Sequence, residues 1–452
     1  MKLRTIAMGM GGILLAASCT NDVVEEVNMG QEISFTTRMT RANAVDNVDA
    51  LKQFRVFAKA EGYTQMFIDG EVAKQGIVSE GKRIFSMDHA YHWPTGTNSI
   101  QFWAYAPTDP TKSKDNDIIK FSLTSSGAPN ITDFTPASYT AAAAAAASAP
   151  VNSHNSGVSH EDLLLAYTKA QRANGTSAIS LNFEHALSQI EVRATIGGDK
   201  NTQLTGNKYD VKVKGVWIAN VKSSGNVTFD ENKNNKLSWS VGSSKVVYGY
   251  EFDTPVSLDH TNSGLLVNND NAKSSLMLVP QKLDIWDISK DNNTKEKNPD
   301  DGAYILLLCR VEATHPGAEH SGNNRDLVLG GESTHIHQMF PVKDGEATFN
   351  DKLYGYVCVP VSTEWLPGKK YIYNLEFCGL ESGAGIYPPE NDMTDLKLPD
   401  GNGDYEYVKT IPADSGKKPG DPVLTDPIKF SVSVSPWDEA WKDGNEGDIP
   451  MK

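Results

Sequence analysis

Cysteine is scarce in this sequence, which has only four in 452 residues, at positions 19, 309, 358 and 378. No two of them have the C-x-x-C spacing of structural zinc sites, so the cysteine pattern does not indicate zinc. Cys309, Cys358 and Cys378 lie in apolar segments, where a free thiol behaves as a small hydrophobic group. We expect buried free thiols at these positions; one disulfide plus one free cysteine is the alternative.

Catalytic signatures are also missing. The sequence contains no G-x-S-x-G, H-E-x-x-H or G-x-x-x-x-G-K-[ST] motif, and no G-x-G-x-x-G that opens a helix. His335 and His337 would share one face of a strand, but a metal site needs a third ligand and supporting groups. Residues 400–404 begin like a calcium loop, but Ile411 stands where the bidentate glutamate belongs. We predict no enzyme activity, no metal site and no cofactor.

Positive charge is in deficit, because 42 basic residues stand against 57 acidic ones and the net charge is −15. A negative field repels phosphate backbones, so we predict no nucleic-acid partner. Helical periodicity is rare as well. The uncharged stretch at residues 5–17 is shorter than the ~20 residues that a helix needs to cross a membrane.

The same stretch has the length of a signal-peptide core and follows two basic residues, Lys2 and Arg4. Small residues at 16–18 lead directly to Cys19, an arrangement that resembles the lipobox of bacterial lipoproteins. The resemblance implies that residues 1–18 are a signal peptide and that the Cys19 thiol is acylated, which anchors the chain in a membrane; a plain secretory signal is the alternative. We expect residues 19–30 to form an acidic tether. Such a run also resembles the surface-export signal of lipoproteins from Bacteroidales-type bacteria, with a solvated linker as the alternative.

Strand patterns, by contrast, are abundant. Apolar and polar residues alternate in 188–196, 371–377 and 428–434, which is typical of antiparallel strands that cover a core with one face. Clusters of Gly, Pro, Asn, Asp and Ser separate many shorter segments of this kind. We predict an all-β chain of two tandem β-sandwich domains, residues 31–175 and 176–452. Long loop insertions are expected at 130–160, 284–302 and 379–427.

Six segments together resemble the fimbrillin family, the pilin-like lipoproteins of Bacteroidales-type surface fimbriae. Each is a strand with an aromatic residue, proline or arginine beside it: ISFTTRMTRAN (33–43), YHWPTGTNSIQFWAYAP (91–107), LNFEHALSQIEVRA (181–194), LMLVPQ (276–281), WLPGKKYIYNLEF (365–377) and IKFSVSVSPWDEAW (428–441). The resemblance implies two transthyretin-like antiparallel β-sandwich domains. It also implies a lipidated precursor at the outer membrane, a trypsin-like cut after an arginine behind the first strand, and a strand of another subunit that fills the vacated groove.

In this chain, the strand to be lost would be residues 31–37, with Ile33 and Phe35 pointing inward. Arg38 and Arg41 are the two candidate cut sites; ordinary basic linker residues are the alternative. The candidate donor strand lies near the C-terminus and equally suits the role of the chain's own last strand. Its inward-facing residues are Ile428, Phe430, Val432 and Val434.

We therefore expect a structural or tip subunit of a cell-surface fimbria, which serves adhesion and binds other fimbrial subunits and a host or bacterial surface ligand. A lipoprotein that does not polymerise and binds glycan or a host ligand through its long loops is the alternative. Trp93, Trp103 and Trp239 are the candidates for stacking on sugar rings, with core packing as the other interpretation. The long loops of the second domain favour a tip position.

Overall fold

The computed structural model describes residues 32–39, 51–79, 82–123, 129–136, 162–172, 178–197, 208–230, 236–258, 264–267, 276–286, 302–317, 325–328, 334–346, 348–389, 398–401, 403–436 and 448–449. In these residues the regular structure is β, apart from one 3₁₀ turn, η1 (Lys114–Asn116). The strands lie in several sheets, so the predicted all-β, sandwich-type fold is confirmed.

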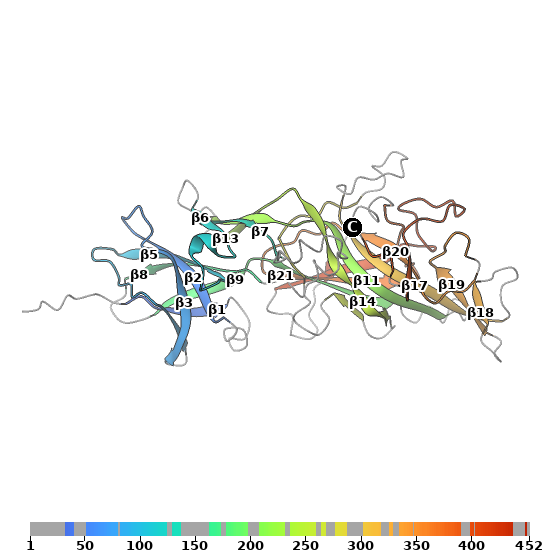
Figure 1. Cartoon of the computed structure of the whole chain (residues 1–452), viewed down its shortest axis with the longest axis horizontal. Coiled ribbons are helices and arrows are strands. Elements are labelled where there is room, and N and C mark those ends of the chain that lie inside the picture. The colour runs from blue at the N-terminus through green and yellow to red at the C-terminus, as the bar shows by residue number, and fades with distance from the viewer. Residues whose placement is uncertain are drawn as a thin grey trace, which may run out of the picture.

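The N-terminal part, at the left of Figure 1, is a seven-stranded sheet that closes on itself. Its strands in spatial order are β1 (Phe35–Met39), β4 (Lys82–Met87), β3 (Ile68–Ser79), β2 (Gln53–Ala60), β5 (Ser99–Ala106), β8 (Leu164–Gln171) and β9 (Ile179–His185). Neighbours pair antiparallel except β1 and β9, whose parallel pairing closes the ring. Side chains that point inward fill the closed sheet with phenylalanine and aliphatic residues.

The C-terminal part is a sandwich of two sheets. The first contains, in order, β14 (Lys245–Ser257), β11 (Lys208–Lys222), β17 (Tyr304–Pro316), β19 (Thr334–Phe340) and β18 (Asp326–Val328), with β20 (Leu353–Pro360) also on β17 and β22 (Glu406–Val408) on β20. The second contains β15 (Gly264–Val267), β10 (Ser188–Ile196), β21 (Lys369–Phe377), β23 (Lys429–Pro436) and β24 (Asp448–Ile449), with β16 (Leu276–Leu278) also on β10. Apolar residues of β10 and β21 meet those of β11 and β17 in one core.

The segment that follows β21 covers the outer face of the first of these two sheets. Leu398 and Tyr407 pack there against Trp217, Tyr304 and Tyr356 in a separate buried cluster. The described part of the insertion predicted at 379–427 is therefore a packed layer of the domain. Its burial follows from the side chains of the sheet below, which are apolar on both faces rather than on one and include several aromatic residues on the outer face.

A fourth sheet joins the two parts, and we call it the bridging sheet. Its order is β13 (Lys236–Val241), β12 (Gly225–Asp230), β7 (Pro129–Phe134) and β6 (Phe121–Leu123), so each half of the chain supplies two strands. Under it lies a core in which Phe57, Trp103 and Leu165 of the closed sheet meet Val227 and Phe229 of β12. The insertion predicted at 130–160 thus begins within a strand, β7, that pairs across the two parts.

The boundary predicted between residues 175 and 176 falls between β8 and β9, and these two strands pair with each other in the closed sheet. Phe183 of β9 belongs to the N-terminal core, whereas Ile190 of β10 belongs to the C-terminal core. We propose that the two domains divide at Ala186 and Leu187, which lie between β9 and β10.

Candidate functional site

The first strand is held in the closed sheet from both sides. On one side, five residues of β1 pair in parallel with β9, from Phe35 opposite Ile179 to Met39 opposite Phe183. On the other side β1 pairs with β4 at a single position, Phe35 opposite Phe85. Just before the strand, the Ile33 N–H donates a hydrogen bond of 2.7 Å to the Tyr91 carbonyl oxygen. If β1 left, the facing edges of β4 and β9 would lose their backbone partners.

The side chains of this segment anchor it in the core. Ile33 is 3% exposed and Phe35 is 0% exposed, as the alternation in the sequence predicts for inward-facing positions. The Phe35 ring meets the rings of Phe54 and Phe102 edge to face, with centroids 5.8 and 5.6 Å away. Burial of each of these two side chains stabilises the fold by roughly 1.5–3 kcal/mol. The slot under β1 is therefore apolar and deep enough for large side chains.

The candidate processing residues are placed only in part. Arg38 lies within β1, because the strand continues to Met39 instead of ending at residue 37 as predicted. Its backbone is in register with Asn182 of β9. Arg41, the second candidate cut site, and Cys19, the candidate lipidation site, lie outside the described residues.

The candidate donor segment forms β23, which lies inside its own sheet. Eight of its residues pair with β21, from Lys429 opposite Glu376 to Pro436 opposite Lys369. The other edge of β23 pairs with β24 at two positions, Val432 opposite Ile449 and Ser433 opposite Asp448. Its apolar side chains contribute to the sandwich core, where Ile428 and Val432 are buried and Phe430 and Val434 are partly buried.

Cys309, Cys358 and Cys378 are buried free thiols, as predicted. Burial raises the pKa of the Cys378 thiol to about 12, so the thiolate needed for reaction is rare at neutral pH. Cys309 and Cys358 lie on the adjacent strands β17 and β20, but they belong to two different clusters, one on each face of the sheet. The thiols therefore serve as core side chains.

Histidines gather at the far end of the first C-terminal sheet. The His315 ring centroid lies 5.4 Å from that of His335 and 6.0 Å from that of His337. Nδ1 of His337 is 2.5 Å from Oδ1 of Asp326, whose side chain is fully buried. No sequence pattern indicates Asp326, because the register of β18 on β19 is what brings it opposite His337. In the described ranges no group of three or more His, Cys, Asp or Glu residues has an arrangement that could hold a metal ion.

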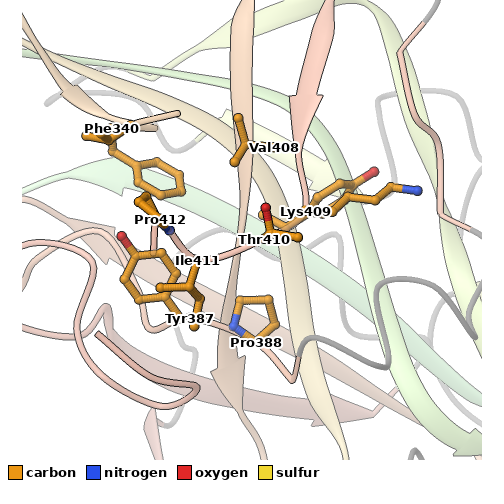
Figure 2. A pocket seen from close by; sticks show the side chains of 10 residues that line it. Phe340, Tyr387, Pro388, Val408, Lys409, Thr410, Ile411 and Pro412 are labelled. Carbon is orange, nitrogen blue, oxygen red and sulfur yellow. The ribbon is translucent and has the colours of Figure 1, made fainter. Parts of the chain in front are cut away.

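One small cavity lies where the segment that follows β21 meets the first C-terminal sheet (Figure 2). Phe340, Tyr387, Pro388 and Ile411 are among the residues that line it, and its volume is about 10 Å³. This volume holds about one water molecule, so a sugar ring does not fit. Of the tryptophans proposed for sugar stacking, Trp93 and Trp103 are buried and Trp239 is partly buried. Core packing is therefore the role that the structure gives to Trp93 and Trp103.

Comparison with known proteins gives the family. The model of the fimbrillin-like family matches residues 37–305, which is more than half of the chain. The chain belongs to the fimbrillin-like family. The predicted resemblance is thereby confirmed, and membership indicates a fimbrial or adhesive surface protein with a structural role. No helix in the part of the chain that the structure describes is long and apolar enough to cross a membrane.

Solved structures of other proteins are similar to this chain at low identity. One, assigned to cell adhesion, comes from Parabacteroides distasonis ATCC 8503; it has 12% identity and a TM-score of 0.37, and the match covers 90% of this chain and 100% of that chain. Another, also assigned to cell adhesion, comes from Bacteroides ovatus ATCC 8483, with 13% identity, a TM-score of 0.34 and coverage of 77% and 92%. The search of curated proteins gives no match.

Proposed function

We propose that this protein is a lipid-anchored subunit of a surface fimbria that assembles by protease-triggered exchange of its first strand. The observation that carries the proposal is the position of β1. This strand is short, pairs with β4 at one position only, and fills an apolar slot with Ile33 and Phe35. A sheet that loses such a strand offers unpaired backbone groups and an apolar groove, which another chain can fill by strand addition.

The cut that releases β1 would follow Arg38 or Arg41. A protease binds its substrate as an extended chain without other backbone partners, whereas Arg38 lies within the paired strand. We therefore favour Arg41, which follows β1 in the sequence. The released segment would include Ile33 and Phe35, and the lipid on Cys19 would leave with it.

The donated strand would come from the C-terminus of another subunit. In its own chain β23 is paired on both edges, most extensively with β21. Donation of β23 would break this pairing, whereas donation of the segment after it would break, among the residues that the structure describes, the two-residue pairing of β24. We therefore assign the donor role to residues 437–452. A head-to-tail contact of this kind does not close on itself, so it builds a filament.

The test uses the mature chain from residue 20, treated with a trypsin-like protease. We expect a new N-terminus after Arg41 or Arg38 by mass spectrometry, followed by multimers that resist SDS. Arg41→Ala and Arg38→Ala should identify the site, and Arg172→Ala, at an exposed position just after β8, is the matched control. Cleavage without multimers would indicate a subunit that ends a fibre. A stable, uncut monomer would contradict strand exchange and favour a surface lipoprotein that does not polymerise.

A further inference from the structure

The junction between the two domains is short and buried. β9 ends at His185 and β10 begins at Ser188, so only Ala186 and Leu187 lie between them. Both are 0% exposed. Linkers that let domains swing are exposed and have few contacts, so this junction has the opposite character.

Three backbone polar groups of the junction have hydrogen-bond partners. The Ala186 N–H donates to the Leu163 carbonyl oxygen at 2.8 Å, and the Leu187 carbonyl oxygen accepts from the Gly368 N–H at 2.8 Å. The Ala186 carbonyl oxygen accepts a hydrogen bond of 2.8 Å from the indole Nε1 of Trp239, which lies on β13 of the bridging sheet. Leu163 directly precedes β8 of the closed sheet, Gly368 directly precedes β21 of the sandwich, and Trp239 lies in the bridging sheet, so all three regions hold the same two residues.

The junction also lies in the middle of a continuous line of paired strands. β1 pairs with β9 in parallel at five positions, β9 continues into β10, and β10 pairs with β21 in parallel at eight positions. β21 in turn pairs with β23 at eight positions. Tension along such strands loads their hydrogen bonds together in shear, whereas a force across a sheet edge breaks them one at a time.

We propose that residues 179–196 are the tension-bearing element of the subunit and that Trp239 fixes their junction so that the two domains form one rigid unit. The tension role rests on the proposed function, because a pulling force acts between the β1 groove and the C-terminal strands only when the subunit is part of a fibre. The bridging sheet resists bending, since its β7 and β12 come from opposite sides of the junction and pair with each other. Figure 1 shows this sheet alongside the narrow region between the two parts.

The first measurement tests rigidity on the uncut monomer, so it does not depend on assembly. Spin labels at Glu184→Cys and Lys282→Cys, both exposed positions on opposite sides of the junction, give the distribution of distances. We expect one narrow peak for the wild-type background. Trp239→Phe keeps an aromatic ring and removes the indole N–H, and it should lose the narrow peak. Insertion of Gly-Gly-Ser between Ala186 and Leu187 is the positive control for a hinge.

Trp93→Phe is the matched control, because the Trp93 indole donates an equivalent bond of 2.9 Å to the Thr97 carbonyl oxygen within the N-terminal domain. It should keep the narrow peak. Constant-force pulling of the same monomers between their ends should then give a shorter folded lifetime for Trp239→Phe than for Trp93→Phe. A broad wild-type distribution, or equal lifetimes for the two variants, would overturn the inference. A rigid monomer that never assembles would contradict only the proposed function.

Discussion

The ring of Phe35 meets the ring of Phe54 edge to face, with the centroids 5.8 Å apart. This contact ties the first strand to β2, which lies across the closed sheet from it. Because β1 has only one register pair with β4, its hold depends on β9 and on buried side chains. The Phe35 ring is therefore, with the Ile33 side chain, one of the two buried groups that hold the segment in place.

Phe35→Ala should weaken the N-terminal domain and loosen β1. A large-to-small change at a fully buried phenylalanine costs about 3–5 kcal/mol, from lost burial and the cavity left behind. We expect this loss in urea unfolding of the uncut chain. In this variant, the amide hydrogens of β1 should exchange with solvent faster than those of β5.

Thr36→Ala is the control, since Thr36 is the next residue in the same strand and only partly buried. It should change the free energy of unfolding by no more than about 0.5 kcal/mol, as substitutions away from the core usually do. Equal effects at the two positions would show that the alternation of β1 does not decide its stability.

Asp117→Asn should destabilise the N-terminal domain by about 3–5 kcal/mol, because the change leaves a buried cation without its partner. The Arg55 Nε lies 2.7 Å from Asp117 Oδ2, and both side chains are almost fully buried. The Arg55 guanidinium also donates to the carbonyl oxygens of Gly70, Asp109 and Lys112, so it ties the loop before β6 to the sheet. Urea unfolding measures the loss. Lys74→Ala, which removes an exposed ion pair with Asp88, should cost no more than about 1 kcal/mol.

The same pair predicts acid sensitivity. Burial raises the pKa of Asp117, but hydrogen bonds from the Asp109 N–H, Thr108, Arg55 and Tyr105 outweigh burial and leave the pKa below its usual value. A carboxyl with a lowered pKa in the folded state contributes stability above its unfolded pKa of 3.8 and loses it as the pH falls through the folded value. Stability of the wild type should therefore fall below about pH 4. Asp117→Asn should show a shallower fall.

The three thiols should be unreactive in the folded chain. Cys309 and Cys378 have a raised pKa because they are buried, and Cys378 reaches about 12. We expect no labelling by an aromatic disulfide reagent at pH 8 and labelling of all three after unfolding in urea. Rapid labelling of the folded chain would contradict the buried positions, and failure to label the unfolded chain would indicate a disulfide.

The sequence was most informative where a single face meets a single core. Alternation placed Ile33, Phe35 and Val432 at buried positions, because period-two burial is a local property of a strand. It was least informative where strands from distant segments meet. β7 lies in a stretch predicted to be a loop, yet it pairs with β12 more than ninety residues later in the chain. Pairing of this kind depends on the register between distant segments, which the local pattern of each segment does not reveal.

The position that we propose for the domain boundary and the packing of the segment after β21 both show what composition alone does not predict. Gly, Asn and Ser at residues 173–177 look like a linker, but β8 and β9 on either side pair as neighbours. The segment after β21 is rich in Pro, Gly and Asp and was predicted to be a loop; its few aromatic residues, such as Tyr407, are enough to bury it against Tyr356. Composition describes the average polarity of a segment, whereas packing is decided by a small number of large side chains.

Val432→Asp separates the two roles considered for β23. Val432 is 1% exposed and belongs to the sandwich core, while Ser431, its neighbour on the opposite face of the strand, is only partly buried. If β23 serves its own sheet, a carboxylate at residue 432 has no partner in the core. The free energy of unfolding of the uncut monomer, measured in urea, should then fall by about 3–5 kcal/mol. Ser431→Asp should have little effect. If instead β23 were spare until donated, Val432→Asp would leave the monomer as stable as the wild type and abolish only the multimers formed after cleavage. The eight-position pairing with β21 favours the first outcome, because a strand so extensively bonded to its own chain leaves at the expense of the whole sheet.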